Sequence, residues 1–225
     1  MQKVLGIYLP DGDTHFPDML RRSHLFAGKG AYQLNKIEAA LGVCKRHRVA
    51  VDIGAHVGLW TRILACTFGK VHAFEPVKEY LECLHLNIED KRDKVHVYGN
   101  ILLGSERGVA PVMRVASNSG NTHVGLLVEG EFEANGEQLA MYRFDDLWDG
   151  DCIDFIKIDV EGYEYEVVLG AAETIKRTKP VMVVEQKPGN AERYGRKTGE
   201  VLDLLKSWGA SIVWVKNGDY CLKWG

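Results

Sequence analysis

The stretch VDIGAHVGLW, residues 51–60, predicts a buried strand that turns into a helix. Gly54 permits the turn at the strand end, and Gly58 permits close packing of the following helix. A dinucleotide-binding loop would need G-x-G-x-x-G, but His56 and Leu59 occupy its second and third glycine positions. No Gly-Lys-Ser/Thr follows, which excludes a Walker loop. The stretch therefore favours a ligand without a pyrophosphate, with a helix start that binds no ligand as the alternative.

Strands and helices alternate on both sides of this stretch. We expect strands over 49–54, 70–76, 94–100, 154–160 and 180–186, and helices over 32–46, 59–68, 77–89, 163–177 and around 201–208. This alternation predicts an α/β fold with a mostly parallel sheet and right-handed crossovers. Residues 105–145 interrupt the alternation, and we expect an antiparallel insertion there, with a turn at Asn135-Gly136, that covers a pocket.

The end of the chain separates two kinds of nucleotide-binding sheet. Asn217-Gly218 lies between two strand-like runs and predicts an antiparallel hairpin. A parallel sheet finished by such a hairpin is the seven-stranded, Rossmann-like layout of class I methyltransferases, with helices on both faces. We expect this domain to span 49–225, behind a helical or irregular segment over 1–48.

Composition limits the class of protein. The 225 residues carry a net charge of −3 with a pI near 6.2, which argues against a general nucleic-acid binder. The five cysteines form no CxxC pair, which fits reduced thiols better than a disulfide framework or a zinc site. Neither a signal peptide nor an apolar run of membrane-spanning length is evident. We therefore expect a soluble cytoplasmic protein with no membrane partner.

The first two strand ends carry groups suited to a nucleoside. The helix start after Gly54 offers free N–H groups for a carboxylate, and Asp52 could attract an ammonium, as the methionine end of S-adenosylmethionine would require. Glu75 lies about 20 residues further on, where an acid can accept hydrogen bonds from a ribose diol. Pro76 then stops the strand. A solvated acid at a strand end is the alternative for Glu75.

The later strand ends carry polar groups for an adenine and an acceptor. Asn100-Ile101 could flank an adenine, although an ordinary loop asparagine is equally consistent. Asp159 ends the fourth strand and Glu161 follows two residues later, so both carboxylates would face one side of an extended chain. Glu161 could equally be an acid at a helix start. Glu185 ends the fifth strand and could line the substrate side or form a salt bridge.

These motifs together resemble the FkbM family of S-adenosylmethionine-dependent methyltransferases. The resemblance rests on VDIGAHVG, HAFEP, the strand ending at 100, RFDDL, IDFIKIDVEGYEYEVVLGA and KPVMVVE, over about 50–186, with KIDVEG the most specific block. It implies methyl transfer, usually to a hydroxyl of a sugar, polyketide or other small metabolite. The cofactor-binding residues that we assign on this basis are Asp52, Gly54, Ala55, His56, Gly58, Glu75, Pro76, Asn100, Ile101 and Asp159. The family commonly has asparagine where this chain has His56.

The expected reaction is in-line attack of an acceptor hydroxyl on the sulfonium methyl, helped by a proton acceptor. The candidates are Asp159, then Glu161, then His56. The carboxylates Asp159, Glu161 and Glu185 could supply oxygens to Mg²⁺, but nothing in their spacing demands it, and we expect no metal. A nicotinamide-dependent oxidoreductase and a cofactor-binding module without catalysis are the alternatives. We expect a small-molecule or sugar acceptor; the oligomeric state is not predicted.

Overall fold

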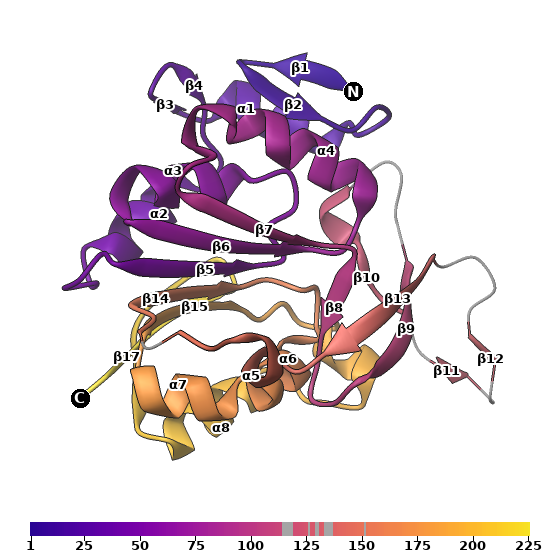
Figure 1. Ribbon diagram of the computed structural model, residues 1–225, viewed down its shortest axis with the longest axis vertical. Helices are drawn as coiled ribbons and strands as arrows, with labels where there is room; N and C mark the ends of the chain where they lie inside the picture. The colour runs from indigo at the N-terminus through magenta and orange to yellow at the C-terminus, as the bar shows by residue number, and fades with distance from the viewer. Residues whose placement is uncertain (114–118, 126, 129–130, 133–136, 151) are drawn as a thin grey trace.

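The computed structural model describes residues 1–113, 119–125, 127–128, 131–132, 137–150 and 152–225 (Figure 1). Its centre is a seven-stranded sheet in the order β16-β17-β15-β14-β5-β6-β7. The strands are β5 (Val49–Ile53), β6 (Lys70–Glu75), β7 (Val95–Gly99), β14 (Phe155–Ile158), β15 (Val181–Glu185), β16 (Ala210–Lys216) and β17 (Asp219–Trp224). The five strands from β15 to β7 are parallel, and β17 is antiparallel to both of its neighbours.

The terminal hairpin between β16 and β17 has a local cause. Asn217 and Gly218 both have positive φ, 48° and 85°. Two positive φ angles in sequence are what a tight hairpin turn of the primed type needs, and Asn-Gly adopts them readily. The hairpin predicted from this dipeptide is therefore present, and it supplies the antiparallel edge of the sheet.

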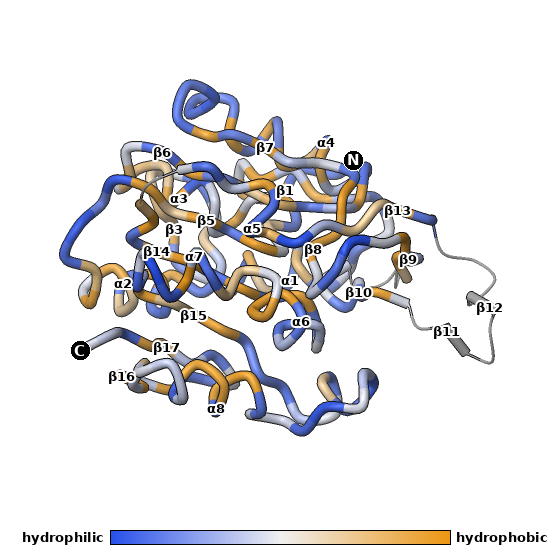
Figure 2. Tube along the Cα trace, turned by 60° about the horizontal axis from the view of Figure 1, so that its bottom comes forward, coloured by the Kyte–Doolittle hydropathy of each residue, from blue (hydrophilic) through white to orange (hydrophobic). Residues whose placement is uncertain are grey.

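Helices cover both faces of the sheet, as Figure 1 shows. One face carries α2 (Leu34–Leu41), α3 (Leu59–Thr67) and α4 (Lys78–Asn87), and the other carries α5 (Phe144–Leu147), α6 (Glu164–Gly170), α7 (Ala172–Thr178) and α8 (Glu200–Ser207). Alternate residues along one strand point to opposite faces. In β14, Phe155 joins the α2 and α3 side of the core while Ile156 and Ile158 join the α6 to α8 side. Figure 2 shows this apolar character along central strands such as β15.

Two predicted helices differ from the structure. The helix expected over 163–177 is two helices, α6 and α7, that meet at Ala171. The cause lies in α5, where the Asp145 carboxylate accepts hydrogen bonds from the backbone N–H groups of Glu173 and Thr174 and so caps a new helix. The helix expected over 32–46 is only Leu34–Leu41: the left-handed Gln33 sets its start, and a turn at residues 42–43 follows its end.

The first 30 residues, in which the sequence predicts no element, form β1 (Gln2–Val4), β2 (Ile7–Leu9), α1 (His15–Arg22), β3 (Leu25–Phe26) and β4 (Lys29–Gly30). β1 pairs with β2 and β3 with β4, both antiparallel. Phe16 and Leu20 of α1 pack in one apolar cluster with Val57 and Tyr80. The segment 1–48 therefore shares its core with the sheet domain.

The insertion forms a second sheet in the order β10-β9-β13-β8. Its strands are β8 (Ile101–Leu103), β9 (Gly108–Met113), β10 (His123–Val124) and β13 (Glu137–Tyr142), and β11 (Leu127–Val128) pairs separately with β12 (Glu131–Phe132). β9 is antiparallel to β10 and β13, as expected, but β13 is parallel to β8, which precedes the expected insertion and for which the sequence predicted no element. This second sheet thus contains both parallel and antiparallel strand pairs. The turn predicted at Asn135-Gly136 lies outside the described residues.

Short 3₁₀ turns complete the chain at η1 (Glu89–Lys91), η2 (Ser119–Asn121) and η3 (Ala191–Tyr194). None of the helices in the described ranges combines the length and apolar character that a membrane crossing requires.

Candidate active site

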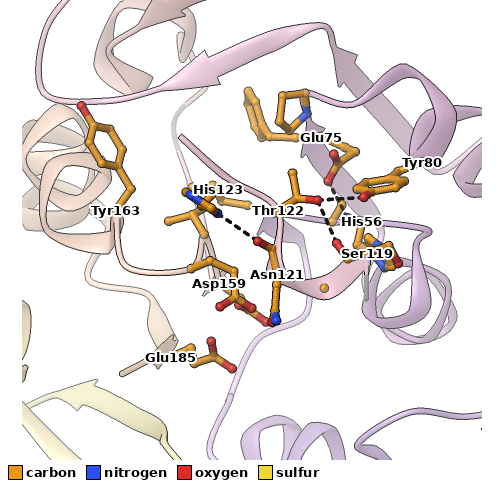
Figure 3. Close-up of a pocket in the computed structure, with 18 of the residues that line it drawn as sticks. His56, Glu75, Tyr80, Ser119, Asn121, Thr122, His123, Asp159, Tyr163 and Glu185 are labelled. Carbon is orange, nitrogen blue, oxygen red and sulfur yellow. Dashed lines mark hydrogen bonds between the residues drawn. The ribbon is translucent and has the colours of Figure 1, made fainter. Parts of the chain in front are cut away.

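A cavity of about 440 Å³ lies at the carboxyl ends of the central strands. It is lined by strand-end residues and by the insertion (Figure 3) and also by the N-terminal segment. Of the residues predicted for the site, nine line it: Gly54, Ala55, His56, Glu75, Pro76, Ile101, Asp159, Glu161 and Glu185. Asp52, Gly58 and Asn100 do not. A cavity of this size belongs to the small-molecule class of binding sites.

The loop after β5 depends on its two glycines. Gly54 has φ of +74°, and a Cβ added there would lie 1.9 Å from the backbone oxygen of Asp159. Gly58 has φ of +82° at the start of α3, and a Cβ there would lie 3.1 Å from Leu84. Only glycine combines the left-handed conformation with the missing side chain that lets the β5 and β14 loops touch.

Asp52 lies behind this loop rather than in the cavity. It is fully buried, its Oδ2 accepts a hydrogen bond from the Thr61 hydroxyl at 2.6 Å, and its Oδ1 lies 3.5 Å from Lys157 Nζ. Lys157 also donates to the backbone oxygen of Gly54 at 2.8 Å. The structure therefore places Asp52 as a support of the loop, which differs from the contact with a ligand ammonium that we expected.

Glu75 reaches the cavity from the end of β6. Its two carboxylate oxygens accept the backbone N–H groups of His56 at 2.8 Å and Val77 at 2.9 Å. Burial raises the pKa of Glu75 to about 7, although these two hydrogen bonds and Lys157 oppose the shift. Each oxygen has a second lone pair, so Glu75 can still accept hydrogen bonds from a ribose.

His56 is held on several sides. Its ring lies between Phe16 and Tyr80, with ring centroids at 4.8 Å and 4.6 Å. Nε2 lies 2.7 Å from Ser119 Oγ (Figure 3). Burial lowers the pKa of His56 to about 4, so the imidazole is neutral near pH 7. The residue has left-handed backbone, with φ of 52°, a conformation in which asparagine and histidine are both enriched among the residues other than glycine.

Three carboxylates meet at the ends of β14 and β15. Oxygens of Asp159, Glu161 and Glu185 all lie within 4.8 Å of one another. The chain is not extended at Glu161, where φ is +54°, so the carboxylates meet through a left-handed turn. Lys187 Nζ lies 2.8 Å from Glu185 and 3.4 Å from Glu161. Such a set could hold a divalent cation, and the absence of a metal stays a prediction.

The three carboxylates differ in charge state. Burial raises the pKa of Glu185 to about 10, with the neighbouring Asp159 charge adding to the shift and Lys187 opposing it. Burial and Asp159 also raise the pKa of Glu161. Burial alone would raise the pKa of Asp159, but Lys157, 3.6 Å away, and Lys187 together hold it below its usual value. Asp159 is therefore the carboxylate that this cluster keeps ionised.

Glu164 shapes the loop that carries these acids, a role that the sequence reasoning missed. It is buried, and its Oε1 accepts the backbone N–H groups of Val160 at 3.1 Å and Gly162 at 3.0 Å. Gln186 donates to Oε2 at 3.2 Å. These contacts explain why a glutamate ends the sequence VEGYE. The Glu164 side chain turns back and accepts hydrogen bonds from the backbone N–H groups on both sides of the left-handed Glu161. An acid in the first turn of a helix was the available signal.

The cap, which we define as residues 13–32 and 119–124, lines the cavity together with the strand ends. The Tyr80 hydroxyl lies 2.7 Å from Thr122 Oγ1 (Figure 3). The Tyr194 hydroxyl donates to the Val124 backbone oxygen at 2.7 Å. Asp13 accepts the Ser119 hydroxyl. The sequence reasoning missed these residues because their partners lie 42 to 106 positions away.

A family model for the methyltransferase FkbM domain matches residues 52–212. The match runs from Asp52 through the acid cluster to β16. The chain belongs to this family. It is therefore a methyltransferase, and membership implies use of S-adenosylmethionine. The resemblance predicted from KIDVEG and the other motifs is confirmed. No curated protein matches the chain.

Solved structures resemble this FkbM-family methyltransferase in fold. A methyltransferase FkbM from Methylobacillus flagellatus KT is 19% identical with a TM-score of 0.50, and the match covers 78% of this chain and 43% of that one. A precorrin-6y C5,15-methyltransferase from Geobacter metallireducens GS-15 is 15% identical with a TM-score of 0.51, and the match covers 97% and 98%. The chain thus spans less than half of the first protein and nearly all of the second.

Proposed function

We propose that this enzyme transfers the methyl group of S-adenosylmethionine to a hydroxyl oxygen of a small molecule or sugar. The supporting observation is the unequal charge of the acid cluster, in which Asp159 alone has a lowered pKa and lies at the end of β14 beside the cavity. An ionised carboxylate at that position can accept the proton that a hydroxyl must lose. Glu161 and Glu185, with raised pKa values, are suited to hydrogen-bond an acceptor.

The residues at the other end of the cavity fit S-adenosylmethionine. Gly54 keeps the β5 loop free of a side chain, and the first turn of α3 offers N–H groups and a positive dipole end to a carboxylate. Glu75 is an acid with spare lone pairs for a ribose. When bound there, the cofactor would supply an activated methyl group, and the protein would supply positioning and exclusion of water.

Family membership favours this proposal over the nicotinamide-dependent oxidoreductase and over the non-catalytic module. The cavity volume supports a small acceptor, because sites of a few hundred Å³ enclose single small molecules. The net charge of −3 supports the same choice over nucleic acid, whose binders usually present a basic field.

The test is Asp159→Asn, assayed by calorimetry with S-adenosylhomocysteine and by methyl transfer to a panel of sugars, other hydroxyl compounds and amines. We expect turnover to fall by about 10²–10⁴, because asparagine cannot accept the proton. Cofactor affinity should be retained, because the asparagine side chain keeps an oxygen that can accept a hydrogen bond from the cofactor. Asp203→Asn, on the exposed side of α8, is the matched control. Full turnover in Asp159→Asn would exclude it as the base, and transfer to amines alone would contradict hydroxyl methylation.

A further inference from the structure

A chain of three side chains links the cap to the β5 loop. Ser119 Oγ lies between His56 Nε2, at 2.7 Å, and Asp13 Oδ2, with which it makes a short hydrogen bond. Asp13 belongs to the N-terminal segment, Ser119 to the insertion and His56 to the loop between β5 and α3. Asp13 and Ser119 are 2% and 3% exposed, so water does not compete for their hydrogen bonds.

The hydrogen bonds that link Asp13, Ser119 and His56 run in one fixed direction from donor to acceptor. Asp13 Oδ1 accepts the backbone N–H groups of His15 and Phe16, and Oδ2 accepts the backbone N–H and the hydroxyl of Ser119. The Ser119 hydroxyl donates its single proton to Asp13 Oδ2, so that proton is not available to any other acceptor. The serine oxygen can then only accept from His56, which requires a proton on Nε2.

This direction determines the other ring nitrogen. A neutral imidazole with a proton on Nε2 carries a lone pair on Nδ1. Among the described residues, His56 Nδ1 has no hydrogen-bond partner, and the residue lines the cavity next to Glu75, which holds its backbone N–H. The packed rings of Phe16 and Tyr80 hinder the ring from turning over.

We propose that Asp13 and Ser119 are positioning residues that hold His56 as the Nε2–H tautomer, so that Nδ1 accepts a hydrogen bond from the bound cofactor. The donor is an ammonium or a ribose hydroxyl, because S-adenosylmethionine offers both. The tautomer does not depend on the reaction, whereas the ligand contact rests on the proposed function. Asparagine at 56, common in the family, also offers an acceptor, but on a shorter side chain.

The tautomer is tested by ¹⁵N NMR of the histidine ring nitrogens in the free protein near pH 7. In the wild type we expect His56 Nε2 at the shift of a protonated nitrogen and Nδ1 at that of an unprotonated one. Asp13→Asn keeps an oxygen for the α1 amides but places an NH₂ against Ser119, which lets the serine donate to His56 and should reverse the assignment. Asp11→Asn, whose side chain is 74% exposed, should leave it unchanged.

If Asp13→Asn does not fold, Ser119→Ala tests the same row of hydrogen bonds. It removes the acceptor for Nε2–H, so the chemical shifts of the two ring nitrogens should both move toward an averaged value. A wild-type protein with the proton on Nδ1, or with averaged shifts, would overturn the tautomer. Unchanged shifts in folded Asp13→Asn or Ser119→Ala would overturn the positioning role of the residue changed.

The ligand contact is tested by adding two probes and following Nδ1. S-adenosylhomocysteine carries the ammonium and the ribose, while 5′-methylthioadenosine carries only the ribose. If both probes change the chemical shift of His56 Nδ1, its hydrogen-bond donor is a ribose hydroxyl. If only S-adenosylhomocysteine changes it, the donor is the ammonium. Binding of both, seen by calorimetry, with no change at Nδ1 would overturn the contact. Failure of S-adenosylhomocysteine to bind would instead overturn the proposed function and the contact with it, leaving the tautomer result intact.

Discussion

The two sides of the cavity are held together by different means. The sheet loops, residues 53–59 and 159–164, are fixed through their backbone: Gly54, Glu161 and Gly162 have positive φ, and the two loop backbones are in direct contact. The buried carboxylates of Glu75 and Glu164 also accept backbone N–H groups of these loops. The cap is fixed by side-chain hydrogen bonds such as Asp13 to Ser119. Backbone contacts leave no room for substitution, whereas each side-chain bond contributes only about 1 kcal/mol. We therefore expect damage to the sheet loops to unfold the site and damage to the cap to loosen it.

The largest expected effect is that of Gly54→Ala. The new Cβ would lie 1.9 Å from the Asp159 backbone oxygen, and the left-handed conformation adds its own strain. We expect the free energy of unfolding to fall by more than about 3 kcal/mol, because two loops must separate. Urea unfolding followed by circular dichroism measures it.

Gly189→Ala separates the two causes in this prediction. Gly189 has φ of +89°, but nothing lies within 4 Å of the Cβ that would be added there. Its substitution should cost only the conformational strain, about 1–2 kcal/mol. Equal losses in the two variants would show that contact between the β5 and β14 loops contributes nothing.

The next effect is that of Glu164→Ala, which leaves the backbone N–H groups of Val160 and Gly162 without their acceptor. We expect a loss of about 2–3 kcal/mol, the cost of buried donors left unpaired. Turnover should also fall, because these amides hold the turn that carries Glu161. Glu173→Ala, in a side chain that is 80% exposed, should stay within about 0.5 kcal/mol. Stability and turnover that match this control would refute the organising role of Glu164.

The same contrast explains how far the sequence could be interpreted. The sheet was predictable because its strands are short apolar runs, and its loops were predictable because a turn such as the one after β5 demands glycine. Asp52 was expected to attract a ligand ammonium, but its carboxylate is buried behind the loop, since its partner Thr61 Oγ1 is visible only in the fold. The break at Ala171 depends on Asp145, which belongs to another element. β8 was missed because three residues are too few to show the alternation of apolar and polar side chains that indicates a strand.

The cap was unpredictable for a related reason. Its bonds join residues of unremarkable type, such as Ser119 and Tyr194, that no spacing rule connects. A serine followed by glycine and asparagine predicts a turn and nothing more. Of the residues that the cap contacts, only His56 stood out, because it occupies a glycine position of the dinucleotide-binding loop and the FkbM family commonly has asparagine there. The neighbours of His56 hold its ring in place: the ring packs between Phe16, which belongs to the cap, and Tyr80, which belongs to α4.

The smallest effect is expected for Tyr194→Phe, which tests the cap directly. The change removes one hydrogen bond to the Val124 backbone oxygen and keeps the ring that packs against Tyr163. We expect a loss of about 1 kcal/mol in the free energy of unfolding, the usual net contribution of one hydrogen bond. Because Val124 lines the cavity, KM for the acceptor should rise while kcat changes little.

Tyr165→Phe is the matched control, since the Tyr165 ring stacks on Arg196 and its hydroxyl has no hydrogen bond among the described residues. It should change neither stability nor KM. If Tyr194→Phe lowered kcat as strongly as Glu164→Ala does, the cap would be part of the reaction geometry rather than a cover over it. The distinction between a rigid strand-end site and a cover held by separate hydrogen bonds would then fail, because a cover of that kind contributes to binding and leaves the position of Asp159 unchanged.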